Sequence, residues 1–195
     1  MTFALTTDAP VLRTERLDLW HPVASDLPGL YATVAVAAVR RFLGNRPTTM
    51  VEESARLLRN AGSWALYGYG TFVLRPRGNE TILGICGVFR SWRGLAPEKG
   101  GLGLEDVPEA GWILGEASWG QGLAGEAMRA ALAWFDATHG PQRIACMIEE
   151  GHHASMRLAH ALGFEAYALH QADDGERPLV LLERLDAGQP RKAMP

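Results

Sequence analysis

Cysteine is scarce in this sequence: Cys86 and Cys146 are the only two in 195 residues. Each lies within an apolar run that is typical of a strand, and neither has a metal-ligating partner beside it. Neither a disulfide nor a cysteine-based metal site is therefore expected. We expect both thiols to be buried and reduced, because free cysteine is among the most buried residue types.

Long apolar runs are also lacking, since none approaches the roughly 20 residues that a membrane-spanning helix needs. The first ten residues, MTFALTTDAP, have neither the basic start nor the apolar run of a signal peptide. We therefore expect a cytoplasmic protein that has no membrane partner. The sequence lacks an excess of positive charge as well: its formal net charge is −3, and no nucleic-acid-binding motif occurs. Nucleic acid is thus not an expected partner.

Apolar residues are abundant, at 47% of the chain, which is enough for the core of a domain. No linker-like break divides the sequence. We expect one domain over residues 1–186 and a disordered tail over residues 187–195.

Hydrophobic periodicity and turn residues predict a mixture of strands and helices. The expected strands are 13–20, 70–75, 81–90, about 107–114, 143–149, 164–170 and 178–184. The expected helices are 27–42, 51 to a stop at Gly62, about 124–135, and 153–162, which stops at Gly163. The stripes expected to face the core in the first two helices are Val36, Val39 and Leu43, and Val51, Ala55 and Leu58.

The segment from Ser91 to Pro108 is long, rich in glycine and without periodicity. Loops longer than about 12 to 15 residues are usually functional or disordered. The segment either covers an acceptor site or is a decoration without a role.

The stretch from Glu109 to Glu126, EAGWILGEASWGQGLAGE, combines an apolar run, a cluster of small residues and the start of a helical run. This order is typical of a strand that leads through a glycine loop into a helix. In that arrangement, backbone N–H groups and the helix dipole point at an anion. The stretch therefore predicts a pyrophosphate-binding loop.

Gly120 to Gly125 reads G-x-G-x-x-G, and Glu149 ends the next expected strand, which is also the pattern of a dinucleotide-binding fold. Three observations weigh against that alternative. Five residues separate Leu114 from Gly120, the motif begins near two-thirds of the chain, and too few residues follow it for repeated βαβ units.

Taken together with residues 152–164, HHASMRLAHALGF, this loop resembles that of the GNAT superfamily of acetyl-CoA-dependent N-acetyltransferases. The likeness is to the subgroup of ribosomal-protein N-terminal alanine and serine acetyltransferases. Gly122 and Ala124 fill the small positions of the loop, and Trp119 stands where the superfamily has arginine or glutamine. The downstream pattern is met by Ala154, Ser155, Gly163 and Phe164, and His152 replaces its asparagine.

The resemblance implies an α/β (α+β) fold in three layers, with about four helices. Its mixed, mostly antiparallel sheet would have about seven strands, and the fourth and fifth strands would splay apart. It also implies acetyl-CoA as co-substrate, bound without a metal. The residues that the resemblance assigns to the coenzyme are Ile113, Leu114, Gly115, Trp119, Gly120, Gln121, Gly122, Leu123, Ala124, Gly125, His152 and Ser155.

The resemblance further places Glu109 as the base that deprotonates the amine, and Ser155 as the hydroxyl that meets the coenzyme sulfur. An alkylammonium has a pKa near 10.4, so a base or a water chain must free the amine at neutral pH. Two alternatives stay open: Glu109 as a solvated carboxylate, and Ser155 as an ordinary residue of a helix N-terminus. His152 can hydrogen-bond to the coenzyme or relay a proton, but it titrates near pH 6.5, as asparagine does not.

The predicted function is transfer of an acetyl group from acetyl-CoA to a primary amine by direct attack in a ternary complex. The amine is a protein N-terminus or a small molecule, and the protein is a monomer or a homodimer. Two alternatives remain: an NAD(P)-binding oxidoreductase and a catalytically silent acyl-CoA sensor.

Overall fold

The computed structural model describes residues 8–94, 104, 107–171 and 177–185. Its strands form one eight-stranded sheet in the order β1-β2-β3-β4-β5-β6-β8-β7. The strands are β1 (Leu12–Arg13), β2 (Leu17–Trp20), β3 (Thr71–Pro76), β4 (Gly84–Phe89), β5 (Glu109–Leu114), β6 (Ile144–Glu149), β7 (Glu165–His170) and β8 (Leu179–Arg184). All neighbours are antiparallel except β5 and β6, which are parallel.

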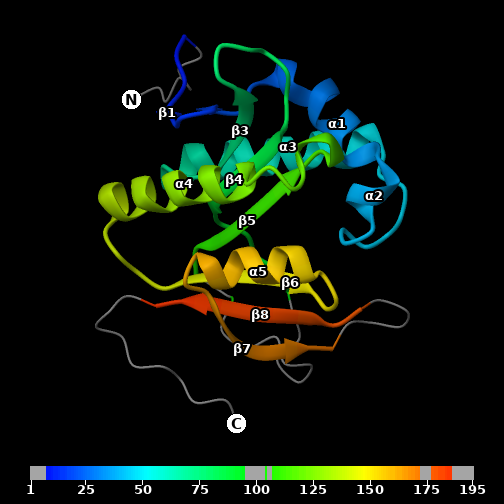
Figure 1. Ribbon diagram of the computed structural model, residues 1–195, viewed down its shortest axis with the longest axis vertical. Coiled ribbons are helices and arrows are strands. Elements are labelled where there is room, and N and C mark those ends of the chain that lie inside the picture. The colour runs from blue at the N-terminus through cyan, green and yellow to red at the C-terminus, as the bar shows by residue number, and fades with distance from the viewer. Residues whose placement is uncertain (1–7, 95–103, 105–106, 172–176, 186–195) are drawn as a thin grey trace.

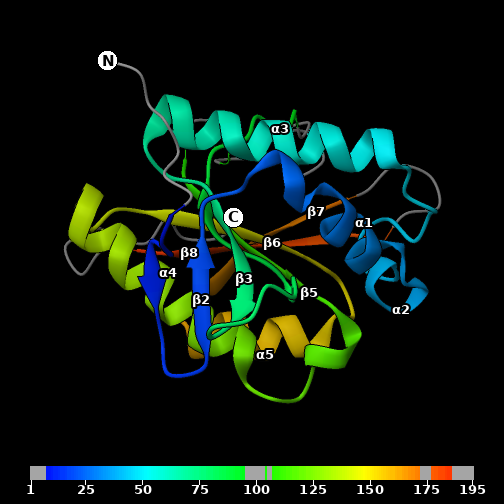
Figure 2. The same cartoon turned by 90° about the horizontal axis from the view of Figure 1, so that it is seen from above.

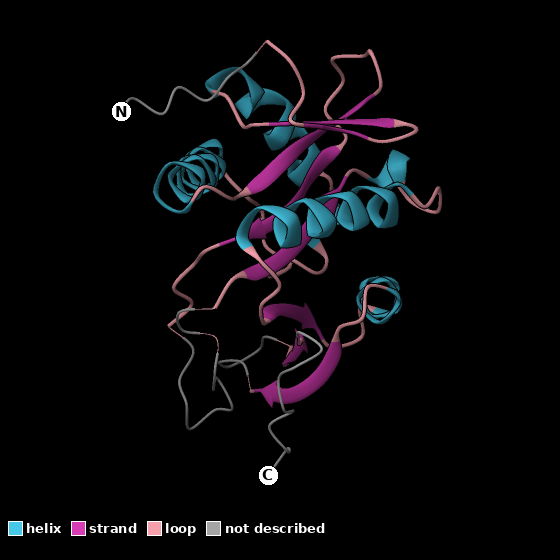
Figure 3. Ribbon diagram, turned by 90° about the vertical axis from the view of Figure 1, so that its left-hand side faces the viewer, coloured by secondary structure: helices cyan, strands magenta, loops and turns pink. Residues whose placement is uncertain are grey.

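The helices are α1 (Leu27–Ala35), α2 (Ala37–Arg40), α3 (Met50–Tyr67), α4 (Leu123–His139) and α5 (His153–Ala161), with short 3-10 turns at Ala24–Asp26 and Glu116–Ser118. They lie on both sides of the strands (Figures 1 and 3). Helix α3 covers one face of the sheet, and α4 and α5 lie on the other (Figure 2). The expected three-layer, mostly antiparallel fold is confirmed.

The core forms where α4 packs on the sheet. Ala127, Met128, Ala131 and Phe135 of α4 are almost completely buried, together with Phe72 and Leu74 of β3 and with Phe164. These four α4 residues are core residues, and Ala124 of the same helix packs partly buried against them. Cys86 and Cys146 are free and buried, and burial raises the pKa of both thiols, as expected.

The strand expected at 13–20 is instead a hairpin of β1 and β2. The Thr14 N–H donates to the Leu17 carbonyl (2.9 Å), and the Leu17 N–H donates to the Thr14 hydroxyl (3.0 Å). These bonds reverse the chain, so the sheet has one strand more than expected. The strand expected at 81–90 begins later, at Gly84.

The single helix expected over residues 27–42 is broken at Val36, where ψ is 128°. The break ends α1 and starts α2. Of the expected stripe, only Val39 is buried, and Val36 and Leu43 are each more than a third exposed.

Helix α3 does not stop at Gly62 and runs on to Tyr67. It ends where Gly68, with a left-handed φ of 76°, donates its N–H to the Trp64 carbonyl. The face expected to be buried points outward, with Val51 78% and Leu58 69% exposed. Its buried residues are Glu53, Leu57, Ser63 and Trp64.

From β5 to β8 the elements agree with expectation to within a residue or two, except that α4 runs four residues further than expected, to His139. Gly163 follows α5 with a φ of 84°, as expected of a residue that ends a helix. The strand order contains a single parallel pair, so the doubly wound sheet of the dinucleotide-binding alternative is wrong. Most of the 91–108 loop and the 187–195 tail lie outside the described residues.

Candidate active site

The site begins where β5 separates from β6. Strand β5 pairs with β4 at six positions, from Glu109 to Leu114. It pairs with β6 only through Glu109↔Ala145 and Ala110↔Cys146. Beyond Ala110, no strand of the described residues pairs with the β6-facing edge of β5, and the expected splay is confirmed (Figure 1).

Main-chain groups of alternate β5 residues point to this open edge. The Gly115 N–H donates to the Leu83 carbonyl (2.8 Å), so the groups of Gly115 and Ile113 face β4. Those of Trp112 and Leu114 face the opening. Among Ile113, Leu114 and Gly115, which the resemblance assigns to the coenzyme, only Leu114 points its main chain that way. Its carbonyl already accepts from the Trp119 indole (2.8 Å). Trp112 was not among the expected residues.

The glycine loop after β5 ends at the N-terminus of α4. Gly122 is the N-cap, with a left-handed φ of 74° and no side-chain cap. The first helical hydrogen bond runs from the Glu126 N–H to the Gly122 carbonyl (3.0 Å). The N–H groups of Leu123, Ala124 and Gly125 therefore have no acceptor within the helix, which is the arrangement that binds an anion.

Two glycines of the loop differ in what would oppose a side chain. A Cβ on Gly122 would lie in nearly open space, 3.7 Å from the Arg16 guanidinium, so it is the backbone conformation that favours glycine there. Gly125 has an ordinary helical conformation, and a Cβ would lie 3.2 Å from the Arg129 guanidinium and 3.5 Å from Leu158 of α5. The Leu158 distance is an ordinary van der Waals contact, so only a small shift of the flexible Arg129 side chain would be needed there.

An ion pair holds the start of α4 against the β1–β2 turn. Arg16 donates to the Glu126 carboxylate from Nε (2.6 Å) and to the Gln121 carbonyl (2.9 Å). The Thr14 hydroxyl donates to the same carboxylate (2.5 Å). The pKa of Glu126 is lowered from its ordinary value. Burial alone would raise it, but the hydrogen bonds from Thr14 and Arg16 together outweigh the effect of burial. Arg16 lies 110 residues from Glu126, and no local sequence signal pointed to it.

A second group of side chains gathers at the N-terminus of α5. His152 is the N-cap, and its Nε2 lies 3.0 Å from the Ser155 hydroxyl. The Trp112 indole N–H donates to the same hydroxyl (3.2 Å). The structure thus brings the two expected residues, His152 and Ser155, together with Trp112 from the open edge of β5.

The hydrogen-bond roles of His152 and Ser155 follow from two groups that can only donate, the Ser155 backbone N–H and the Trp112 indole N–H. The Ser155 backbone N–H points at the His152 Nδ1 (3.5 Å), and from this contact we assign Nδ1 as the acceptor and place the ring hydrogen on Nε2. The Ser155 oxygen then accepts from both His152 and Trp112, and its own hydrogen is left to be donated elsewhere. Burial lowers the pKa of His152, which favours the neutral ring that these roles require.

Phe42, in the turn after α2, covers this group from the other side. Its ring stacks on the His152 ring with 4.1 Å between the centroids. His153, the neighbouring histidine, is exposed.

Glu109, the expected base, is 5% exposed and lies in an ion pair. The Arg93 guanidinium donates to both of its oxygens, from Nε (2.8 Å) and from a terminal nitrogen (2.5 Å). Within the described residues, Glu109 has no hydrogen bond to Ser155 or His152. Its side chain lies on the opposite face of β5 from Trp112, because the two residues are three positions apart.

The remaining loop residues take varied positions. Trp119 is 47% exposed, although its indole N–H donates to the Leu114 carbonyl. Gly120 is exposed and has a φ of 71°. The Gln121 side chain donates back to the Ala117 carbonyl (2.7 Å), and Leu123 is buried in the core. In the part of the chain that the structure describes, no group of three metal-ligating side chains occurs. Nor is any helix of that part long and apolar enough to cross a lipid bilayer.

Residues 16–165 match the family model of the acetyltransferase (GNAT) domain. A putative GnaT-family acetyltransferase from Bordetella pertussis is 33% identical, with a TM-score of 0.75 over 89% of this chain and 98% of that one. RimL, a ribosomal L7/L12 alpha-N-protein acetyltransferase solved in complex with coenzyme A, is 16% identical, with a TM-score of 0.69 over 92% of this chain and 99% of its own. At that identity the likeness is one of fold.

The uncharacterized protein YkkB of Bacillus subtilis (strain 168) is 28% identical over 97 residues, which are 50% of this chain and 51% of that protein. The match thus spans about half of that curated relative. The family model covers most of the chain, and the Bordetella protein is similar over nearly its whole length. The chain belongs to the GNAT family of acetyltransferases.

Proposed function

We propose that the protein transfers an acetyl group from acetyl-CoA to a primary amine by direct attack in a ternary complex. The observation that carries this proposal is a strand with an open edge, β5, that leads through a glycine loop to the uncapped N-terminus of α4. A strand edge can pair with an amide-bearing arm, and a helix N-terminus can bind a pyrophosphate. The coenzyme A complex of RimL, which has the same fold, supports this assignment.

In this proposal, the N–H groups of Leu123, Ala124 and Gly125 bind the pyrophosphate. The pantetheine arm lies along β5 and pairs with the main chain of Trp112 and with the Leu114 N–H, because the Leu114 carbonyl is occupied by Trp119. That path brings the thioester toward the Ser155 hydroxyl, which Trp112 contacts.

The reaction forms a C–N bond and breaks the C–S bond of the thioester. The amine nitrogen attacks the acetyl carbonyl carbon, and the thiolate of coenzyme A leaves. Ser155 donates its free hydrogen to the leaving sulfur and is reprotonated from solvent, and solvent in turn takes the second proton that the nitrogen loses after its attack. Glu109 accepts the proton of the ammonium group through a water, using the lone pairs that Arg93 leaves free.

Release of free thiol from acetyl-CoA, measured with a panel of amines and N-terminal peptides, tests the proposal. We expect release that depends on an amine, with initial-rate plots that intersect, as a ternary complex requires. Acetyl-CoA binding without thiol release on any acceptor would favour the silent sensor, and parallel plots would contradict direct attack.

The assignment of Glu109 is tested in the same assay with Glu109→Gln. We expect a loss of roughly 10²-fold or more, largest at low pH, since positioned bases contribute about 10²–10⁴-fold. Arg93→Gln is the matched control, because it also breaks the ion pair but keeps the carboxylate. Equal losses in the two variants would show that the ion pair matters and that Glu109 is not the base.

A further inference from the structure

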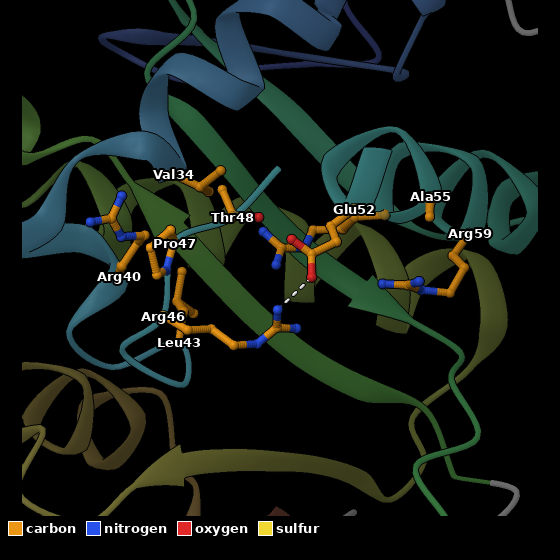
Figure 4. Close-up of a pocket in the computed structure, with 10 residues that line it drawn as sticks. Val34, Arg40, Leu43, Arg46, Pro47, Thr48, Glu52, Ala55 and Arg59 are labelled. Carbon is orange, nitrogen blue, oxygen red and sulfur yellow. Dashed lines mark hydrogen bonds and ion pairs between the residues drawn. The ribbon is translucent and has the colours of Figure 1, made fainter. Parts of the chain in front are cut away.

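A cavity of about 210 Å³ opens between α1, α2 and the start of α3. It lies outside the coenzyme site described above, and four arginines line it (Figure 4). Its lining residues are Val34, Arg40, Leu43, Arg46, Pro47, Thr48, Glu52, Ala55, Arg56 and Arg59. We call it the arginine pocket.

The arginine pocket has more positive charge than its own carboxylates balance. Arg46 pairs with Glu52 (2.5 Å), and Arg56 pairs with the buried Glu53 (3.0 Å). Arg40 donates to the Ala35 carbonyl (2.6 Å). Arg59 has no direct ion pair or hydrogen bond within the described part of the chain. In the described part of the chain, neither Arg40 nor Arg59 forms an ion pair with a carboxylate, although the charge of Arg59 acts on the buried Glu53 and favours its ionised form.

Guanidinium groups gathered in this way repel one another, and an anion relieves the repulsion. Arginine binds carboxylates and phosphates through paired, charge-assisted hydrogen bonds. A cavity of about 210 Å³ is large enough for one such group and small for a peptide segment. The pocket is therefore suited to the anionic end of a small molecule.

Two residues next to lining residues contact the proposed reaction centre. Phe42, between the lining residues Arg40 and Leu43, stacks on His152. Thr33, next to the lining residue Val34, places its methyl group 3.8 Å from where a Cβ on Gly115 would lie. The segments that form the pocket therefore also reach His152 and the end of β5.

The coenzyme phosphates have a different site. The N–H groups proposed to bind them belong to α4, which lies on the opposite face of the sheet from α3 (Figure 2). Helix α1, which carries Val34, packs against α3. An anion in the arginine pocket would therefore belong to the acceptor and not to the coenzyme.

We propose that the acceptor is a small amine that bears a carboxylate or phosphate group, and that the arginine pocket binds this group while the amine reaches the thioester. The inference rests on the proposed acetyl transfer and specifies its substrate class.

The test compares amines of matched length. Aminoalkyl phosphonates and amino acids with a terminal amine and carboxylate are set against uncharged alkylamines, over a range of chain lengths, with an acidic peptide as a further acceptor. We expect kcat/KM to be at least about tenfold higher for one anionic series, since hydrogen bonds to charged groups are worth that factor or more. The better series identifies the anion as carboxylate or phosphonate.

The variant Arg59→Gln removes a guanidinium that makes no hydrogen bond or close ion pair in the described part of the chain, so we expect the fold to be kept, and thermal unfolding checks this because Arg59 also acts on the charge of Glu53. We expect KM for the preferred anionic amine to rise about tenfold, while KM for acetyl-CoA and for the alkylamines stays the same. Arg77→Gln, an exposed arginine outside the pocket, is the control and should change none of these values. Equal use of charged and uncharged amines, equal effects of Arg59→Gln on both, or a preference for the acidic peptide would overturn the proposal.

Calorimetry separates this inference from the proposed reaction. An aminoalkyl phosphonate or amino acid that binds the wild type, and binds Arg59→Gln about tenfold more weakly, supports the pocket even if no acceptor releases thiol. If thiol release occurs with uncharged amines and neither anionic probe binds, acetyl transfer stands and the anionic acceptor is wrong.

Discussion

His152 shows how one side chain changes the chemistry of the site. It occupies the position where the resembling enzymes carry asparagine, and it caps α5 with a ring nitrogen. Its neutral form lets Nδ1 accept from the Ser155 N–H, while Nε2 donates to the Ser155 hydroxyl. Protonation of Nδ1 would replace that acceptor with a second donor. The position therefore becomes sensitive to pH, as an asparagine would not be.

We predict that activity falls as the pH drops through the pKa of His152 in the folded protein. Burial lowers this pKa, so the neutral ring prevails above the ordinary value near 6.5 and is lost below the folded value. The pH dependence of kcat/KM should show this acid limb, and His152→Asn should remove it. His153→Asn, at the exposed neighbour, should leave the limb in place. A limb that persists in His152→Asn would contradict the prediction.

At the residue scale, the sequence predicts site residues best where they belong to a local motif. It predicted the positions of His152 and Ser155, which the structure joins, and the loop that ends at Gly122. It missed Trp112, Arg93 and Phe42, because their roles depend on contacts between segments far apart in the chain. The role of Glu109 stays a prediction, now with Arg93 as a partner that the sequence did not suggest.

At the scale of elements, α3 shows why an apolar stripe does not reveal which face is buried. Its outward face carries Val51 and Leu58, while the inward face uses polar side chains to reach β3. The Asn60 amide exchanges two hydrogen bonds with the backbone of Thr71, and the Trp64 indole donates to the Thr71 carbonyl (3.0 Å). Such contacts give no hydrophobic periodicity, so the predicted face was wrong.

Gly62 lies in the interior of α3, where a glycine was expected to end the helix. A Cβ there would meet nothing within 4 Å. We predict that Gly62→Ala stabilises the protein by about 1 kcal/mol, because alanine loses less backbone entropy in a helix. Thermal unfolding should show a rise of roughly 2–4 °C.

Gly68 provides the opposite control for α3. Its φ of 76° is left-handed, so Gly68→Ala should lower the melting temperature. A neutral or destabilising Gly62→Ala would mean that the glycine has a packing or functional role.

At the scale of the whole molecule, the site spans segments that only the folded chain brings together. The start of α4 is held by Arg16 in the β1–β2 turn, and α5 approaches α4 at Gly125. Coenzyme bound between β5 and β6 would contact both α4 and α5. Binding should therefore be reflected in the stability of the entire domain.

We predict that acetyl-CoA at about 100 times its Kd stabilises the folded state by about 2.7 kcal/mol. For a chain of this size the melting temperature should rise by roughly 5–10 °C. Gly122→Val should abolish this shift, because valine disfavours the left-handed N-cap conformation that aims the N–H groups.

Gly78→Val is the matched control, since Gly78 has a φ of 68° and open space around it in the β3–β4 turn. It should lower the melting temperature of the free protein through the same backbone strain and keep the shift on acetyl-CoA. A full shift in Gly122→Val would rule out the proposed pyrophosphate site.

The sequence by itself determined the class of fold, nearly every element from β5 to β8, and the glycine loop, because these depend on local periodicity and on residues that terminate helices. It also carried the resemblance that the family match confirmed. Only the tertiary structure decided which face of α3 is buried, where the 13–20 segment turns back, and that Glu109 pairs with Arg93. It alone gathered four arginines from α2, α3 and the turn between them into one pocket. The physical reason is that contacts between distant segments depend on how the elements pack, which local sequence patterns do not record.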